Sequence, residues 1–139
     1  MHKIGLIFIL GLLMACRGQK VKPGQWPKDR ISFGNNGGFT GAQQRFELFE
    51  NGQVFYISGL DTAEQKRLKR KQTKLIFAEA DKLYKSGIKE NKLGNMTNFI
   101  NYTHDTIFMN WQWPTSGIKS VPNDLSPLNQ LLLKAVQSK

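Results

Sequence analysis

The chain has 139 residues, with 20 Lys and Arg against 10 Asp and Glu, and a formal net charge of +10. A single cysteine excludes a disulfide within one chain, so the fold must rest on packing alone. The length suits one domain with a modest core, and the charge favours acidic partners such as lipid headgroups, lipopolysaccharide phosphates or an acidic protein.

The first residues have the pattern of a secretory signal. Lys3 precedes a mainly apolar run from Ile4 to Ala15, which is shorter than the roughly 20 residues that a membrane-spanning helix needs. The run ends in Leu13-Met14-Ala15-Cys16, which resembles the bacterial lipobox. The resemblance implies that residues 1–15 are a lipoprotein signal peptide and that Cys16 carries the acyl chains. The alternative is an ordinary signal peptide followed by a free, oxidisable thiol.

Residues 16–28 contain two prolines and two glycines and have no apolar periodicity, which predicts a flexible tether. By similarity to other lipoproteins, Arg17 in place of Asp disfavours retention at the inner membrane. Some bacterial groups send lipoproteins to the cell surface with an acidic stretch after the cysteine, whereas residues 17–22 are basic, which disfavours that location. We therefore expect the periplasmic face of the outer membrane. Nucleic acid is the usual partner of a basic domain, but an exported protein rarely meets it, and we expect none.

The domain itself should cover residues 29–139 and begin with a strand at 29–33. Residues 44–50 and 53–57 alternate around Asn51-Gly52, which predicts a hairpin with a two-residue loop. In that register Leu48 faces Phe55. The predicted core face of this hairpin then holds Phe46, Leu48, Phe55 and Ile57.

A long helix is expected from Thr62 to about Ser86, because Asp61 and Glu64 resemble a capping box and Gly87 follows. Its apolar side would contain Leu68, Leu75, Ile76, Ala80, Leu83 and Tyr84. Its opposite side would contain Arg67, Arg70, Lys71, Lys74, Lys82 and Lys85.

A second hairpin is expected from residues 97–103 and 106–113, with His104-Asp105 as its turn. Its apolar face would hold Ile100, Tyr102, Ile107, Met109 and Trp111. A short helix should begin at Ser126-Pro127 and bury Leu128, Leu131, Leu132, Ala135 and Val136. The expected fold is α+β, with a four- or five-stranded, mainly antiparallel sheet and both helices on one face.

The segment Gly37-Gly38-Phe39-Thr40-Gly41 has three interpretations. A phosphate-cradling loop should lead into a helix, whereas this segment leads into a strand. The second interpretation is a strand-to-strand turn with Phe39 in the core. The third is a rigid loop that offers Phe39 and Thr40 to a protein partner. Trp111 should pack beneath the long helix, and Trp113 is a candidate contact residue at the end of its strand.

Catalytic and metal-binding groups are scarce in this sequence. His104 and Asp105 are adjacent in a tight turn and point apart, so a solvated turn is the simpler interpretation. His2 and His104 are the two histidines, and the first lies in the predicted signal peptide. We therefore expect no metal site, no cofactor and no enzymatic activity.

The basic helix face also has two interpretations. Such a face is most often solvated. A stripe of one sign, formed by Arg67, Arg70, Lys71 and Lys74, also suits an anionic surface such as lipid or lipopolysaccharide.

The glycine-rich segment, followed by a hairpin, a helix, paired strands and a terminal helix, resembles emfourin. Emfourins are small bacterial inhibitors of thermolysin-like metalloproteases that have a similar Gly-Gly-Phe-Ala-Gly start. The resemblance covers that motif and the order of elements, and it implies a protein-binding module such as a protease inhibitor. The chain differs in Thr40, in its anchor and in its basic helix, and no inhibitory residue can be matched.

Overall fold

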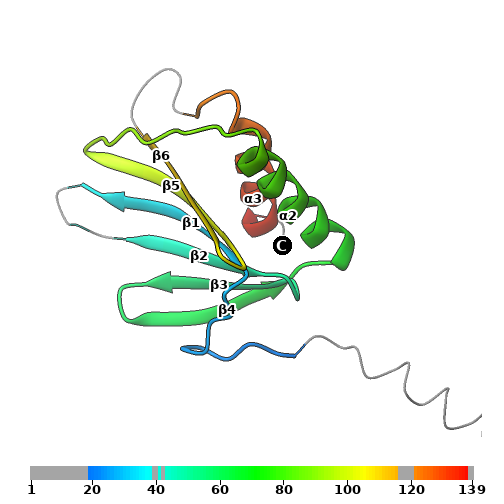
Figure 1. The fold of residues 1–139 in the computed structure, drawn as a ribbon. Helices are drawn as coiled ribbons and strands as arrows, with labels where there is room; N and C mark the ends of the chain where they lie inside the picture. The colour runs from blue at the N-terminus through cyan, green and yellow to red at the C-terminus, as the bar shows by residue number, and fades with distance from the viewer. Residues whose placement is uncertain (1–18, 39–40, 42, 116–120, 138–139) are drawn as a thin grey trace, which may run out of the picture.

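The computed structural model describes residues 19–38, 41, 43–115 and 121–137. The predicted signal peptide, Cys16, Phe39 and Thr40 lie outside this range. The described residues form two layers, a twisted antiparallel sheet and a pair of helices that covers one of its faces (Figure 1). The α+β class is therefore confirmed. No helix among these residues has the length and apolar character to cross a bilayer.

The sheet has six strands rather than the expected four or five, in the order β4-β3-β2-β1-β5-β6. The first four strands form a meander, and α2 carries the chain back to place β5 beside β1. The bounds are β1 Arg30–Gly37, β2 Gln44–Phe49, β3 Gln53–Ser58, β4 Asp61–Arg67, α2 Arg70–Lys85, β5 Met96–His104, β6 Ile107–Pro114 and α3 Ser126–Gln137.

The core lies between the sheet and the two helices. Helix α2 contributes Ile76, Ala80 and Leu83, and α3 contributes Leu128, Leu132 and Ala135. The sheet side contributes Ile31, Phe33, Leu48, Val54, Ile100, Tyr102, Trp111 and Trp113. The predicted buried sides of both helices are thus largely confirmed. Leu75 is the main exception, because it is 54% exposed.

The expected helix start at Thr62 is wrong, because residues 61–67 form the edge strand β4, which pairs with β3. Gly59, with φ +58°, reverses the chain after β3. Between Asp61 and Arg67 the only apolar side chain is Ala63, so a helix here would bury nothing. An edge strand instead satisfies the backbone groups of β3.

The register of the first hairpin is one residue away from the prediction. Leu48 pairs with Val54, not with Phe55. The loop has three residues, and the amide of Gly52 donates to the carbonyl of Phe49 at 2.9 Å while Gly52 has φ +86°. This is a turn followed by a left-handed glycine. Because strand side chains alternate, the shift moves Phe55 and Ile57 to the helix-free face of the sheet.

The second hairpin confirms the predicted face, but its register differs by two residues from the one that a His104-Asp105 loop sets, in which Tyr102 faces Ile107. Tyr102 pairs with Met109, and Ile100 pairs with Trp111. Asp105, at φ +52°, and Thr106 form the turn. A shift of two residues keeps every side chain on its own face, so the predicted apolar set stays together.

The glycine-rich segment lies between β1 and β2, so it leads into a strand and not into a helix. Phe39, which the strand-to-strand interpretation places in the core, lies outside the described residues. Gly37, Gly38 and Gly41 all have positive φ. At Gly37 a Cβ atom would lie 2.5 Å from the carbonyl oxygen of Asn95. Only glycine fits this close approach of β1 to the residue that precedes β5.

Candidate functional site

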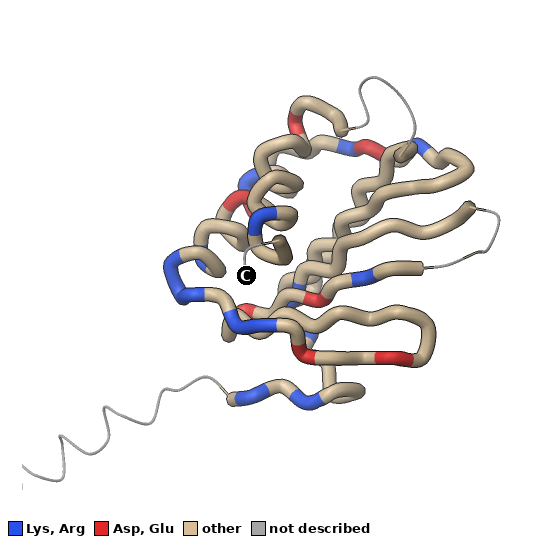
Figure 2. The backbone as a smooth tube through the Cα atoms, turned by 180° about the vertical axis from the view of Figure 1, so that it is seen from behind, with Lys and Arg blue, Asp and Glu red and all other residues tan. Residues whose placement is uncertain are grey.

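The four predicted anion-binding residues lie together and are exposed. Arg67 ends β4, while Arg70, Lys71 and Lys74 lie on the first turns of α2. We use the name basic corner for the segment that joins these two elements and its cations: Lys66, Arg67, Lys69, Arg70, Lys71 and Lys74. Figure 2 shows these cations as a blue run where the chain leaves the sheet for the helix.

The cations of the basic corner that lie at the start of α2 are placed where the helix dipole opposes them. Lys69 occupies the N-cap of α2 without a side-chain capping bond, and the first turn contains no acidic residue. The N-terminus of a helix carries partial positive charge, so each cation there costs about 0.3–1 kcal/mol. An anion at this place would complement both the cations and the helix dipole.

A shallow cavity of about 280 Å³ adjoins the start of α2. Arg70, Thr73 and Lys74 supply its polar lining together with Glu50, and Phe77 closes it. Glu50 is the acidic residue of this lining, and it makes the hollow less positive than the exposed cations of the basic corner beside it. These exposed cations therefore form the better surface for an anion.

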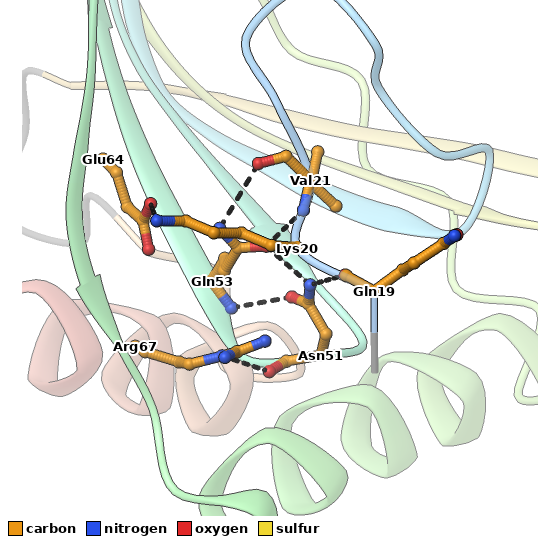
Figure 3. Close-up of polar contacts among 7 residues, drawn as sticks. All are labelled: Gln19, Lys20, Val21, Asn51, Gln53, Glu64 and Arg67. Atoms are coloured by element: carbon orange, nitrogen blue, oxygen red, sulfur yellow. Dashed lines mark hydrogen bonds and ion pairs between the residues drawn. The ribbon is translucent and has the colours of Figure 1, made fainter. Parts of the chain in front are cut away.

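Residues 19–21 lie against the sheet next to the basic corner (Figure 3). The Val21 amide donates to Oε1 of Gln53 at 2.6 Å, and the Gln53 amide group donates back to the Val21 carbonyl at 3.4 Å. Nδ2 of Asn51 donates to the Gln19 carbonyl at 2.9 Å and to Oε1 of Gln53 at 2.6 Å. Gln53 is fully buried, and these bonds satisfy its amide.

The same network reaches the basic corner. Nε of Arg67 donates to the Asn51 carbonyl at 3.2 Å, and the Leu68 amide donates to the Gly52 carbonyl at 2.8 Å. Lys20 lies 3.6 Å from Glu64, an exposed pair that contributes little. We call Gln19, Lys20 and Val21, with Asn51, Gln53 and Glu64, the N-terminal clamp.

Trp26 fixes the rest of this segment on the helix-free face of the sheet. Its ring stacks on Phe49 with centroids 5.4 Å apart and meets the edge of Phe55 at 5.1 Å. The described part of the predicted tether, residues 19–28, therefore contacts the sheet through Gln19, Val21 and Trp26. A large aromatic side chain in a presumed tether was the signal in the sequence that pointed to this.

A buried carboxylate lies on the same face of the sheet. Glu47 is 2% exposed, and it accepts a 2.5 Å bond from the Ser32 hydroxyl. Nε of Arg45 and Nε of Arg30 lie 3.0 and 3.6 Å from its two oxygens. Burial raises the pKa of Glu47 above 4.5, and the Ser32 hydroxyl and the two arginines only partly oppose this.

The structure also brings together three side chains that the sequence did not link. Nδ1 of His104 lies 3.5 Å from Oδ1 of Asp29 and 3.8 Å from Oε1 of Glu50. All three are at least a third exposed, so the arrangement supports a surface ion pair whenever the imidazole is protonated. The expectation of no metal site and no cofactor stays a prediction.

Negative charge near this trio also acts on Tyr102. Burial first, and then the charges of Asp81, Glu50 and Asp29, raise the pKa of the phenol to about 12. Tyr102 therefore stays neutral at physiological pH, and its side chain packs in the core.

The predicted protein-contact residues have a different outcome. Trp113 is 2% exposed and packs in the core, so its assignment to a contact surface is wrong. Trp111 and Trp113 are two residues apart, which puts both on one side of β6, in the core that the sheet forms with α2 and α3. Phe39 and Thr40 lie outside the described residues, and their role stays a prediction.

Comparisons with known proteins give no match, whether to a family model, to a curated protein or to a solved structure. The resemblances to the lipobox and to emfourin therefore stand on the residues quoted above. The candidate site for this chain is the basic corner together with the adjoining N-terminal clamp.

Proposed function

We propose that this protein is a lipid-anchored, non-enzymatic envelope protein whose basic corner binds the phosphate-bearing surface of an anionic membrane. The observation that carries the proposal is the exposure of several cations at the start of α2, where the helix dipole opposes them. Cations that only served solubility would be better placed at the C-terminal end of the helix.

Energetic estimates favour a membrane surface over a small ligand. A Lys or Arg near an anionic leaflet gains about 1 kcal/mol, so the basic corner gains a few kcal/mol in sum. The cavity beside it is shallow and holds Glu50, which disfavours an isolated phosphate group there. Leu75, 54% exposed among the cations, suits contact with the boundary between headgroups and acyl chains.

The anchor is the second part of the proposal. Leu13-Met14-Ala15-Cys16 supports acylation of Cys16, and two or more acyl chains would hold the protein permanently. Arg17 and the basic residues that follow support the periplasmic face of the outer membrane. There the basic corner would meet anionic phospholipid headgroups.

Charge removal at the basic corner should weaken membrane binding. The mature chain from residue 16, with Cys16→Ser to remove the lipid, would be sedimented with phosphatidylcholine vesicles that contain about one-quarter phosphatidylglycerol. The double variant Arg70→Gln/Lys71→Gln should lose about 2 kcal/mol, or about 30-fold in affinity. Rising salt should weaken wild-type binding steeply.

The matched control removes the same charge at the other end of α2 and in the segment that follows it. Lys85→Gln/Lys89→Gln should bind almost as well as the wild type, because these exposed residues lie about a helix length from the basic corner. Equal losses in both double variants would mean that net charge alone drives binding. Binding that ignores salt would reject the proposal.

Protein binding by the glycine-rich segment is the second candidate function, and its position favours it. β1 is eight residues long, so Gly37, where this segment begins, lies about 25 Å from the end where the chain enters the sheet. It would then face away from the membrane. If the resemblance to emfourin extends to activity, the purified domain should inhibit a thermolysin-like protease, and Phe39→Ala/Thr40→Ala should remove the inhibition. No inhibition across a panel of secreted metalloproteases would exclude this candidate.

A further inference from the structure

We propose that the N-terminal clamp leaves only a short connection, residues 16–19, between the lipids of Cys16 and the folded domain. This connection, which we call the leash, holds the basic corner against the leaflet in which the lipids are embedded. This inference rests on the lipid anchor of the proposed function. It adds an orientation: the start of α2 faces the membrane, and the end of α2 points away from it.

The leash is short because the contacts of the clamp begin at Gln19, where the carbonyl accepts a bond from Asn51. Only three peptide steps separate Cys16 from Gln19 (19 − 16 = 3), which span at most roughly 11 Å. A free tether over residues 16–28 would have twelve steps and could reach roughly 43 Å. Docking of residues 19–28 therefore shortens the reach about fourfold.

The leash leaves the domain beside the basic corner. Asn51 contacts Gln19 through its side chain and Arg67 through its carbonyl, so one residue bridges the two (Figure 3). The start of the described chain and the blue run of the corner lie on the same side of the molecule in Figure 2. A domain held at Gln19 therefore presents this side to its anchor point.

The length of the leash matters because electrostatic attraction is short-ranged. Screening at physiological ionic strength limits it to about 8 Å. A reach of roughly 11 Å is comparable to this screening length, whereas a reach of roughly 43 Å is about five times as long and would let the domain leave the field of the headgroups. Glu64 is paired with Lys20, and Glu50 and Asp105 are exposed carboxylates among the described residues at this end of the sheet.

A depth measurement with the lipidated protein tests the orientation. Fluorophores would be placed at Gln72→Cys, near the basic corner, and at Ser86→Cys, fourteen residues (86 − 72) and about 21 Å further along α2. Lipids with a headgroup quencher report how close each fluorophore lies to the membrane. Neutral phosphatidylcholine vesicles remove the attraction of the charges and leave the leash alone.

In neutral vesicles the fluorophore at residue 72 should be quenched several-fold more than the one at residue 86. A flexible insertion of about twelve Gly and Ser residues between Gly18 and Gln19 keeps the clamp and the corner but lengthens the leash. It should reduce the ratio of the two quenching values to near one. The same insertion at the C-terminus is the control and should leave the ratio unchanged.

Equal quenching at both positions in the wild type, or no effect of the N-terminal insertion, would overturn the inference. A difference that appears only in vesicles with phosphatidylglycerol would also overturn it, while it would support the proposed binding by charge. Stronger quenching at residue 72 than at residue 86 in neutral vesicles supports the leash even if the charge variants of the basic corner bind normally.

Discussion

Replacing Glu47 with Ala should lower the free energy of unfolding by about 3 kcal/mol, measured by chemical denaturation. The change would leave Arg45 and Arg30 without the carboxylate that lies 3.0 and 3.6 Å from them. It would also remove the acceptor for the Ser32 hydroxyl. Both arginine side chains are about one-third exposed and can reach water, so the lower end of the range for a broken buried pair applies.

The variant Glu47→Gln separates the charge from the hydrogen bond. Its amide oxygen can still accept from Ser32, its size is unchanged, and it lacks the charge that burial disfavours, so the loss should be at most about 1 kcal/mol. A loss as large as that of the Ala variant would show that the ion pairs dominate. No loss in either variant would mean that the arginines find water equally well.

The difference in stability between the wild type and Glu47→Gln should change with pH in one direction. Because burial raises the pKa of Glu47 in the folded state above 4.5, the folded state binds this proton more tightly than the unfolded state. The wild type should therefore gain stability relative to Glu47→Gln as the pH falls through the folded-state pKa, and the gain should be complete below the unfolded-state pKa. A relative loss on acidification would contradict the raised pKa.

Replacing Gly52 with Ala should also cost about 3 kcal/mol. Gly52 has φ +86°, where another residue loses about 1–2 kcal/mol. A Cβ atom would lie 2.6 Å from the Leu68 carbonyl oxygen, and the backbone must move to relieve that contact. The movement would weaken the 2.8 Å bond from the Leu68 amide to the Gly52 carbonyl, which contributes about another 1 kcal/mol. Thermal or denaturant unfolding measures the sum.

Gly59→Ala is the matched control, because Gly59 also has positive φ but nothing lies within 4 Å of its Cβ position. It should lose only the conformational part, about 1 kcal/mol. Equal losses at the two glycines would show that the close approach to Leu68 is unimportant. Since Gly52 lies between the N-terminal clamp and the basic corner, its substitution should also weaken vesicle binding, whereas Gly59→Ala should leave binding intact.

The basic corner could largely be expected from the sequence, because charged side chains remain in water whichever segment packs beside them. Arg67, Arg70, Lys71 and Lys74 are long cations with few apolar neighbours, and they lie outside in the fold as predicted. The clamp could not be expected in the same way. Its bonds join Val21 to Gln53 and Gln19 to Asn51, each 32 residues apart, and no local pattern encodes such a distance.

The sequence by itself determined the elements that have a strong local period and the faces that they bury. Ile76, Ala80 and Leu83 recur at helical spacing, and α3 does the same with Leu128, Leu132 and Ala135. Alternation in β5 and β6 fixed which side chains share a face even though the pairing was two residues away from the prediction. These features are local, because the interval between side chains sets the side on which each one lies.

Only the tertiary structure decided the features that depend on a partner strand or on one backbone angle. The left-handed Gly52 shifted the first hairpin by one residue and moved Phe55 to the face where Trp26 lies on it. Pairing with β3 made residues 61–67 a strand despite their helical capping pattern. In both cases the decisive energy lies in strand pairing and in packing across the sheet, which outweighs a local propensity of a few tenths of a kcal/mol per residue.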